Sequence, residues 1–318
     1  MDARRILDLL TDPRLPHCLP KALWRRYAFR RRSRSKPVID KLHVLLTVDV
    51  EQDNGRQGPK YDAGMCGPFL ERFSEICRVE GWRTTLFVQG AIVEQLGPQL
   101  RYLEPDHELG LHGYYHELWG SPRWYMRGQT MDIESRRTCL ALGLHGFRRA
   151  GLSRPLSFRA PWLIADQATL RLIQEAGFTI DSSLPSYRGI LPVPYQEGHL
   201  TRIPVTASPT PFLIKRGHFP VFTPYCILNL QNFVLSDEAK ILTVLAEVFA
   251  YQISKQVIPH IVIFMHPWEF YSSPADGFAS EANFDRLVRR LQWLQTLWNL
   301  EYQTMQSFQR ALRLNGLF

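Results

Sequence analysis

The sequence predicts an α/β fold built on a mostly parallel β-sheet, and three observations carry this prediction. Segments with the period of a strand alternate with segments with the period of a helix along most of the chain. The strongest strand-like segments are nearly continuous apolar runs, as expected of strands buried on both faces. The 318 residues can also bury a full core. Such a sheet is either open or closed into a barrel, and its functional residues gather at the C-terminal ends of the strands.

The first half of the chain alternates most clearly. Residues 43–50 (HVLLTVDV) predict a strand rich in β-branched side chains, and residues 67–78 predict a helix that stops before Gly81. The same reasoning gives strands at 82–88, 109–112, 157–159 and 178–181, and helices at 91–103, 130–144 and 167–176.

The second half departs from this rhythm once. Residues 185–224 are rich in Pro, Gly and Thr, which predicts an insertion whose candidate groove residues include Tyr195, His218 and Tyr225. Alternation returns with helices at 236–254 and 282–298, strands at 260–265 and near 302, and a last helix ending at 314. We therefore expect an arm at residues 1–40 and one folded domain at 41–318.

The net charge of +8 belongs to the N-terminal arm. Residues 1–41 carry 12 Lys or Arg against 4 Asp or Glu, whereas the rest of the chain carries 26 of each sign. From Lys21 to Lys36, eight cations are interleaved with Trp24, Tyr27 and Phe29. This pattern suits an anionic membrane surface or nucleic acid, and a solvated arm is an equal alternative. Nucleic-acid binding by the body is disfavoured because the body has neither net positive charge nor a helix-turn-helix signal.

Composition also excludes several classes of protein. No apolar stretch approaches the length of a transmembrane helix, and the first residues show no secretory signal pattern. The five cysteines are odd in number and lack CxxC spacing, which argues against a disulfide framework or a thiolate zinc site. We expect a cytoplasmic protein, with peripheral attachment to the inner face of the membrane as an extension of that view.

Two pairs of candidate ligands or catalytic groups follow predicted strands. Asp49 and Glu51 end the first strand, and residues two apart on a strand point to the same side. His112 and His116 follow the short strand at 109–112, and their spacing predicts two imidazoles on one face of a helical turn, as a divalent metal requires. The alternatives are a solvated strand end for the carboxylates and a polar surface loop for the histidines.

Two more strand ends carry groups with a plausible chemical task. Arg159 in FRAPW could pair with a buried carboxylate and keep it ionised. His266 in FMHPWE could donate or accept a proton near neutral pH, or could simply cap a turn beside the following proline.

Together these motifs resemble those of the polysaccharide deacetylase family, carbohydrate esterase family 4, with its NodB homology domain. TVDVE is similar to the first family motif, HGYYHE to the second, FRAPW to the third and FMHPWE to the last. The segment GFTIDSSL is similar to one that places an aspartate, here Asp181, at the tip of a strand. The resemblance covers roughly residues 40–310, and the wording of HGYxHE and HPWE resembles the branch of peptidoglycan and exopolysaccharide deacetylases.

The resemblance implies a distorted (β/α)7 barrel with one divalent metal ion, zinc or alternatively cobalt or another transition metal. His112 and His116 match the two histidine ligands, and Asp49 matches the catalytic base. The family has two adjacent aspartates in its first motif, whereas Val50 occupies the second place here. We therefore assign Glu51 as the third ligand, with Asp53 as the fallback.

The resemblance also assigns the remaining roles. Arg159 matches the residue that orients the base, and His266 matches the general acid that protonates the leaving amine. The residues expected to contact substrate are Trp162, which forms a groove wall, Asp181 and Trp268.

The activity implied is metal-dependent removal of the N-acetyl group from an amino sugar in a polysaccharide, peptidoglycan or lipid-linked glycan. Two alternatives stay open at this point. The domain could be an inactive glycan-binding pseudoenzyme recruited through its basic arm, or an amidohydrolase that acts on a small cyclic amide.

Overall fold

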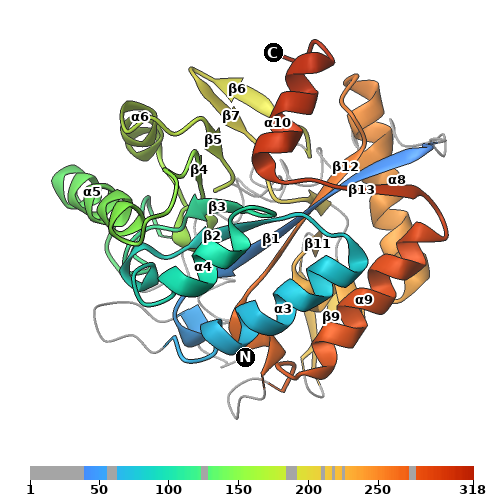
Figure 1. Ribbon diagram of the computed structural model, residues 1–318. Helices are drawn as coiled ribbons and strands as arrows, with labels where there is room; N and C mark the ends of the chain where they lie inside the picture. Colours follow the sequence, from blue (N-terminus) through green and yellow to red (C-terminus); the bar gives the residue numbers. More distant parts are fainter. Residues whose placement is uncertain are drawn as a thin grey trace.

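The computed structural model describes residues 39–55, 63–122, 128–183, 192–208, 212–216, 219–223, 226–271 and 277–318 (Figure 1). The basic arm and two of the candidate groove residues, His218 and Tyr225, lie outside the described residues. The division into an arm and a domain therefore stays a prediction. Among the helices that the structure describes, none is long and apolar enough to cross a membrane.

One curled, mostly parallel sheet organises the molecule, and this confirms the predicted α/β fold with a distorted barrel. Its strands follow the order β12-β1-β2-β3-β4-β5-β7-β6, with β13 also paired to β1. The strands are β1 (Lys41–Val50), β2 (Thr84–Val88), β3 (Glu108–Leu111), β4 (Ser157–Phe158), β5 (Ile180–Asp181), β6 (Tyr195–Glu197), β7 (Leu200–Arg202), β12 (His260–Met265) and β13 (Asn299–Tyr302). All neighbouring pairs are parallel except β6 with β7.

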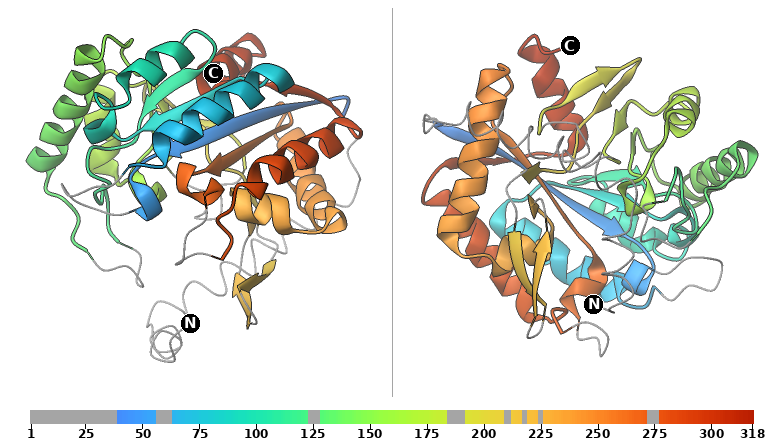
Figure 2. Two further views of the ribbon diagram at one scale, coloured as in Figure 1. Left: turned by 60° about the horizontal axis from the view of Figure 1, so that its bottom comes forward. Right: turned by 180° about the vertical axis from the view of Figure 1, so that it is seen from behind.

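The helices lie around the outside of this sheet, as Figures 1 and 2 show. They are α3 (Cys66–Glu80), α4 (Gly97–Leu103), α5 (Ile133–Arg149), α6 (Gln167–Glu175), α7 (Leu230–Leu235), α8 (Glu238–Ser254), α9 (Ala282–Gln295) and α10 (Met305–Leu314). Three of the longer ones begin at an aspartate or threonine whose side chain accepts a backbone N–H of the first turn, namely α5 at Asp132, α8 at Asp237 and α10 at Thr304.

The two faces of β1 explain how the sequence places the site. Every second residue from Leu42 to Val50 belongs to the core between sheet and helices. Leu45, on the other face, packs in the barrel interior with Phe87 and Val262. Because side chains alternate along a strand, this interior face continues through Thr47 and Asp49 to Glu51 and changes from apolar to polar toward the C-terminal end.

The opposite end of the interior is closed by α10. Met305 and Phe308 pack against the interior core, and the backbone N–H of Met305 donates to Thr85 Oγ1 at 2.9 Å. The backbone N–H of Gln306 donates to the buried carboxylate of Glu108 at 2.8 Å. Asp49 and Glu51, at the C-terminal end of β1, therefore lie at the end of the interior that α10 does not cover.

Two predicted helices differ from the observed ones for reasons visible in the sequence. The helix expected at 91–103 is a 3-10 turn at Gly90–Ile92 followed by α4, because Pro98 occupies the first turn of a new helix. The helix expected at 236–254 begins at Glu238 after a separate short helix, α7. The expected insertion at 185–224 contains β6, β7 and the short strands β8 (Ala207–Ser208), β9 (Phe212–Arg216) and β10 (Phe219–Thr223). β9 pairs with β10, and β8 pairs with β11 (Cys226–Ile227), which lies just beyond the insertion.

Candidate metal centre and active site

Three predicted ligands meet at the C-terminal ends of β1 and β3. Glu51 Oε2 lies 3.0 Å from His112 Nε2 and 2.7 Å from His116 Nε2. One ligand atom from each of these residues lies within 4.8 Å of the others, and all three side chains are buried. Among the described residues this is the cluster whose geometry suits a metal ion, and Asp53, the fallback ligand, is not part of it.

The two histidines are brought together by a loop, so the predicted helical turn is wrong. His112 extends the sheet by one residue, since its N–H donates to the carbonyl of Val88 at 2.9 Å. Gly113 and His116 then adopt left-handed conformations with φ of 60° and 61°. A side chain at Gly113 would lie 3.0 Å from Pro161 and Trp119, which explains the glycine.

Further hydrogen bonds fix the conformation of this loop. His112 Nδ1 donates to the carbonyl oxygen of Arg159 at 2.9 Å, which orients the ring so that Nε2 faces Glu51 Oε2 at 3.0 Å. The carboxylate of Glu117 accepts the backbone N–H of Tyr114 at 2.8 Å and that of Tyr115. Each bond holds the loop in the shape that presents both imidazoles.

The cluster fits a divalent metal by its donor chemistry. Two imidazoles and one carboxylate are a set typical of catalytic zinc sites, which leave a further position open. The carboxylate oxygen and the two imidazole nitrogens already lie within 4.8 Å of one another, as ligands of one ion must. A side chain at Gly55 would approach Glu51 Oε1 and His116 Cε1 at 3.4 Å, so this glycine keeps the space beside the ligands open.

Electrostatics keep Glu51 ready to bind a cation. Burial alone would raise its pKa, but the attraction of His116 and the hydrogen bonds from His112 and His116 hold the pKa well below its usual value. The carboxylate is therefore ionised at neutral pH and supplies a full negative charge to the cluster.

A buried ion pair lies beside the cluster. Arg159 Nη1 donates to Asp49 Oδ1 at 2.7 Å, and the guanidinium is fully buried. It also donates to Thr47 Oγ1 at 2.9 Å and to Ser182 Oγ at 3.0 Å, and lies 4.2 Å from the ring centre of Phe87. Burial lowers the pKa of Arg159 against the opposing attraction of Asp49. The arginine is thus held in place from several sides and in turn holds Asp49.

His266 faces the cluster from the neighbouring strand end, directly after β12. Its Nε2 lies 3.7 Å from Glu51 Oε1 and 4.0 Å from Asp49 Oδ2. Its Nδ1 lies 3.0 Å from Glu269 Oε2. Burial opposes the charged form of the ring, but Glu269 above all, with Glu51 and Asp49, raises the pKa of His266 to about 9.

The three predicted substrate-contacting residues lie in different environments. Trp162 is 39% exposed, has a left-handed backbone with φ of 61°, and its ring lies 4.9 Å from that of His116. Trp268 stacks on His266 at 4.8 Å with an angle of 19° between the rings. Asp181 is buried, and its carboxylate accepts from Arg202 Nε at 2.8 Å and from Ser183. Contact of these residues with substrate stays a prediction.

Several side chains that surround the predicted residues were not predicted. Glu269 follows His266 by three positions, the spacing of a capping box, and this signal could have been read from HPWE. No local pattern reveals Thr47, Ser182 or Phe87 as neighbours of Arg159, because these contacts are made only by the assembled sheet.

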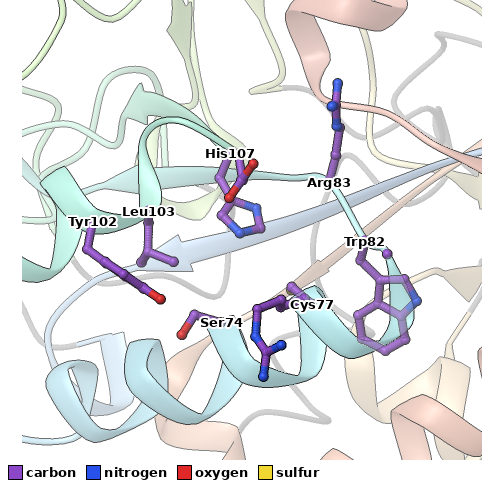
Figure 3. A pocket seen from close by; sticks show the side chains of 10 residues that line it. Ser74, Cys77, Trp82, Arg83, Tyr102, Leu103 and His107 are labelled. Carbon is purple, nitrogen blue, oxygen red and sulfur yellow. The ribbon is translucent and has the colours of Figure 1, made fainter.

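A separate cavity of about 430 Å³ lies away from these residues. Trp82, Tyr102 and His107 are among the residues that line it, and Figure 3 shows it beside α3. Trp82 and His107 precede β2 and β3, so this cavity lies at the end of the sheet opposite the metal cluster.

Comparison with known structures identifies the fold. A proposed polysaccharide deacetylase from Mycobacterium smegmatis is 17% identical, with a TM-score of 0.57 over 89% of this chain and 94% of the other. A protein from Pseudomonas aeruginosa PAO1, also proposed to be a polysaccharide deacetylase, is 14% identical, with a TM-score of 0.57 over 87% of this chain and 92% of the other. The chain has the polysaccharide deacetylase fold.

The same fold also carries another activity. Puue allantoinase is 14% identical, with a TM-score of 0.60 over 87% of this chain and 92% of the other. No family model matches the sequence, and no curated protein matches it significantly. These structures share the fold of this chain, and one fold can carry different activities.

Proposed function

We propose that the protein is a metal-dependent deacetylase that hydrolyses the N-acetyl group of an amino sugar in a polysaccharide, peptidoglycan or lipid-linked glycan. The observation that carries this proposal is that a candidate metal site and candidate acid–base residues lie together at the C-terminal ends of the strands. The Glu51–His112–His116 cluster lies beside Asp49, a candidate base, and His266, a candidate acid. A carboxylate, an imidazole and a metal position within a few ångströms suit hydrolysis of an amide.

The metal would be held by Glu51, His112 and His116. When bound, a divalent ion supplies Lewis-acid chemistry, which polarises a carbonyl group and makes water a stronger acid. Zinc agrees best with the donor set, and cobalt or another transition metal is the alternative.

Asp49 would accept the proton of the attacking water. Its Oδ1 is bound to Arg159, so Oδ2, which faces His266 at 4.0 Å, is the oxygen oriented toward the reacting groups. The ion pair with Arg159 also fixes the orientation of the Asp49 carboxylate.

His266 would complete the reaction by giving its Nε2 proton to the amide nitrogen. The bond between the carbonyl carbon and nitrogen breaks, its electron pair stays on nitrogen, and the products are a free amine and acetate. Trp162 lies beside His116 and Trp268 beside His266, and both offer aromatic surfaces on which a sugar ring could lie.

Hydrolysis of a small cyclic amide is the second candidate, favoured by the shared fold with an allantoinase. The acid, base and metal positions would serve either substrate class, because both reactions break an amide bond. The size of the substrate decides between the two, so oligomers of N-acetylglucosamine and allantoin form the first pair of substrates to compare.

The first experiment measures the metal content of the purified protein. We expect about one equivalent of zinc or another divalent ion, lost when both His112→Ala and His116→Ala are present, and acetate release from N-acetylated oligosaccharides that disappears with it. If the purified protein contains no metal and does not take up added zinc or cobalt, the proposal is refuted. Metal binding with turnover of allantoin alone would select the second candidate.

The basic arm leads to a separate proposal about location. We propose that the segment from Lys21 to Lys36 holds the protein on the anionic inner leaflet of a membrane, where a lipid-linked glycan would be presented. The full chain should sediment with vesicles containing phosphatidylserine and lose this binding in high salt. A chain lacking residues 1–40 that binds these vesicles equally well would overturn the idea, as would preferential binding to nucleic acid.

A further inference from the structure

We infer that Glu269 positions His266 for proton transfer, and that this role belongs to Glu269 and not to Asp181. The inference rests on the proposed function and names a further residue of the same site. It starts from the contacts of the two carboxylates, each of which lies near the end of a strand.

One carboxylate oxygen of Glu269 makes two contacts with His266. Its Oε2 accepts the backbone N–H of His266 at 2.8 Å and lies 3.0 Å from Nδ1 of the ring. The side chain is almost fully buried, so water competes little for these contacts. One carboxylate oxygen therefore holds both the backbone and the ring of the same histidine.

Asp181 is engaged elsewhere. Its Oδ2 accepts from Arg202 Nε at 2.8 Å, and its Oδ1 accepts from the hydroxyl of Ser183. Arg202 is buried as well, and its Nη1 extends the pair to Glu197 at 2.8 Å. This network binds β5 to β7 and β6 and leaves Glu269 as the carboxylate that touches His266 Nδ1.

The ring of His266 is also fixed by its packing. Trp268 stacks on one side at 4.8 Å, and Phe264 contacts it edge-on with ring centres 5.6 Å apart. With Nδ1 held by Glu269, the ring directs Nε2 toward Glu51 and Asp49.

This arrangement decides which proton moves. The Nδ1–H bond points at Glu269, so the proton given to the leaving nitrogen comes from Nε2. After transfer, the neutral ring keeps its proton on Nδ1, in the tautomer that Glu269 stabilises by accepting a hydrogen bond. The electron pair left on Nε2 then faces the site and can take up a proton for the next turnover.

The backbone of residue 269 allows a clean test. Its carbonyl oxygen accepts from Ser280 N at 3.2 Å and from Asn283 Nδ2 at 2.7 Å, and these contacts do not involve the side chain. E269A removes both side-chain contacts with His266, whereas E269Q keeps an oxygen in place but has no charge. D237A, which removes the N-cap of α8, is the control for the loss of a cap outside the site.

Two acetyl compounds separate positioning of an acid from a structural role. An oligomer of N-acetylglucosamine needs a proton on its leaving nitrogen, whereas 4-nitrophenyl acetate has a stable leaving group and needs none. We expect E269A to lose about 100-fold or more in kcat on the oligomer, with KM and zinc content nearly unchanged, and to lose less than about threefold on the ester. E269Q should fall between E269A and wild type, and D237A should match wild type on both compounds.

A spectroscopic measurement makes the test independent of the substrate. Histidine labelled with 15N in the ring and assigned with His266→Gln is measured at alkaline pH, where the ring is neutral. It should show the proton of His266 on Nδ1 in wild type and a mixture of tautomers in E269A. Equal losses on both compounds, or an unchanged tautomer in E269A, would overturn the inference. If the wild type releases no acetate from the oligomer, the proposed function fails, while the tautomer still decides whether Glu269 positions His266.

Discussion

Arg159 donates to Asp49 Oδ1 across 2.7 Å from a guanidinium that no solvent reaches. The pair joins β1 to the strand end after β4, and it connects the folding of the sheet to the chemistry proposed at its edge. A buried charge is costly unless it is paired, so each partner depends on the other.

Replacing Arg159 should therefore destabilise the protein strongly. Arg159→Met leaves Asp49 buried without its cation, and we expect a loss of about 3–5 kcal/mol in the free energy of unfolding, measured by urea denaturation. The matched control is Arg72→Ala, which breaks an exposed pair with Glu281 and should cost less than about 1 kcal/mol. Equal losses in the two variants would contradict a special role for the buried pair.

Gly55 should matter to metal binding beyond its effect on the backbone. The residue has φ of 62°, and a Cβ there would approach both Glu51 and His116 at 3.4 Å. Gly55→Ala should weaken zinc binding about tenfold or more in a chelator competition, in addition to about 1 kcal/mol of backbone strain.

Gly81 provides the control for this strain. It has φ of 70°, and a Cβ there would meet nothing within 4 Å. Gly81→Ala should lower stability by a similar amount and leave zinc affinity unchanged. If both variants bind zinc as wild type does, the ligands tolerate the added methyl group and the argument from Gly55 fails.

Much of the site could be predicted because strands obey a simple rule. Asp49 and Glu51 share a face by the two-residue period of β1, and the C-terminal ends of parallel strands meet at one edge, which brings the histidines to them. The prediction of a helical turn for HGYYH failed because the same spacing fits a loop. Gly113 and His116 take left-handed conformations there, and only the packing against Pro161 and Trp119 reveals why position 113 has no side chain.

The partners of the catalytic candidates were harder to predict for a physical reason. Ser182 and Phe87 contact Arg159 from strands that are distant in sequence, so no local period carries their signal. Glu269 is different, since a capping box at three residues is a local pattern. The sequence placed the charged groups at strand ends, whereas tertiary structure decided which of them pair.

Buried histidines at the other end of β12 predict a loss of stability in mild acid. Burial first of all, with a smaller contribution from nearby His43, lowers the pKa of His260 to about 4, against an opposing hydrogen bond to Ile258. His260 takes up a proton near pH 6.5 in the unfolded chain but only near pH 4 in the folded chain. The free energy of unfolding therefore falls as pH falls through this window. We expect this residue to cost about 2 kcal/mol between pH 7.5 and 5.

The measurement compares urea denaturation of wild type and His260→Gln at both pH values in a chelator. The variant should be less stable at pH 7.5, because it loses packing on Phe308 at 4.7 Å, yet it should lose less stability on acidification. All other ionisable groups are the same in both proteins, so the difference between the two slopes isolates His260. Identical slopes would show that His260 is protonated as readily in the folded chain as in the unfolded one.

Asp49→Asn should separate catalysis from metal binding. The amide keeps the shape of the carboxylate and an oxygen near Arg159 Nη1, but it cannot accept a proton from water. We expect zinc affinity within about threefold of wild type and a loss of about 100-fold to 10,000-fold in kcat for acetate release.

Asp166→Asn is the control, since Asp166 also pairs with an arginine, Arg136 at 2.6 Å, but caps α6 outside the site. Both variants remove the charge opposite a buried arginine, so a comparable drop in thermal stability with turnover lost only in Asp49→Asn would assign the proton transfer to Asp49. Turnover at the wild-type rate in Asp49→Asn would instead require a different base, and the 3.7 Å approach of His266 to Glu51 would make His266 the residue to test next.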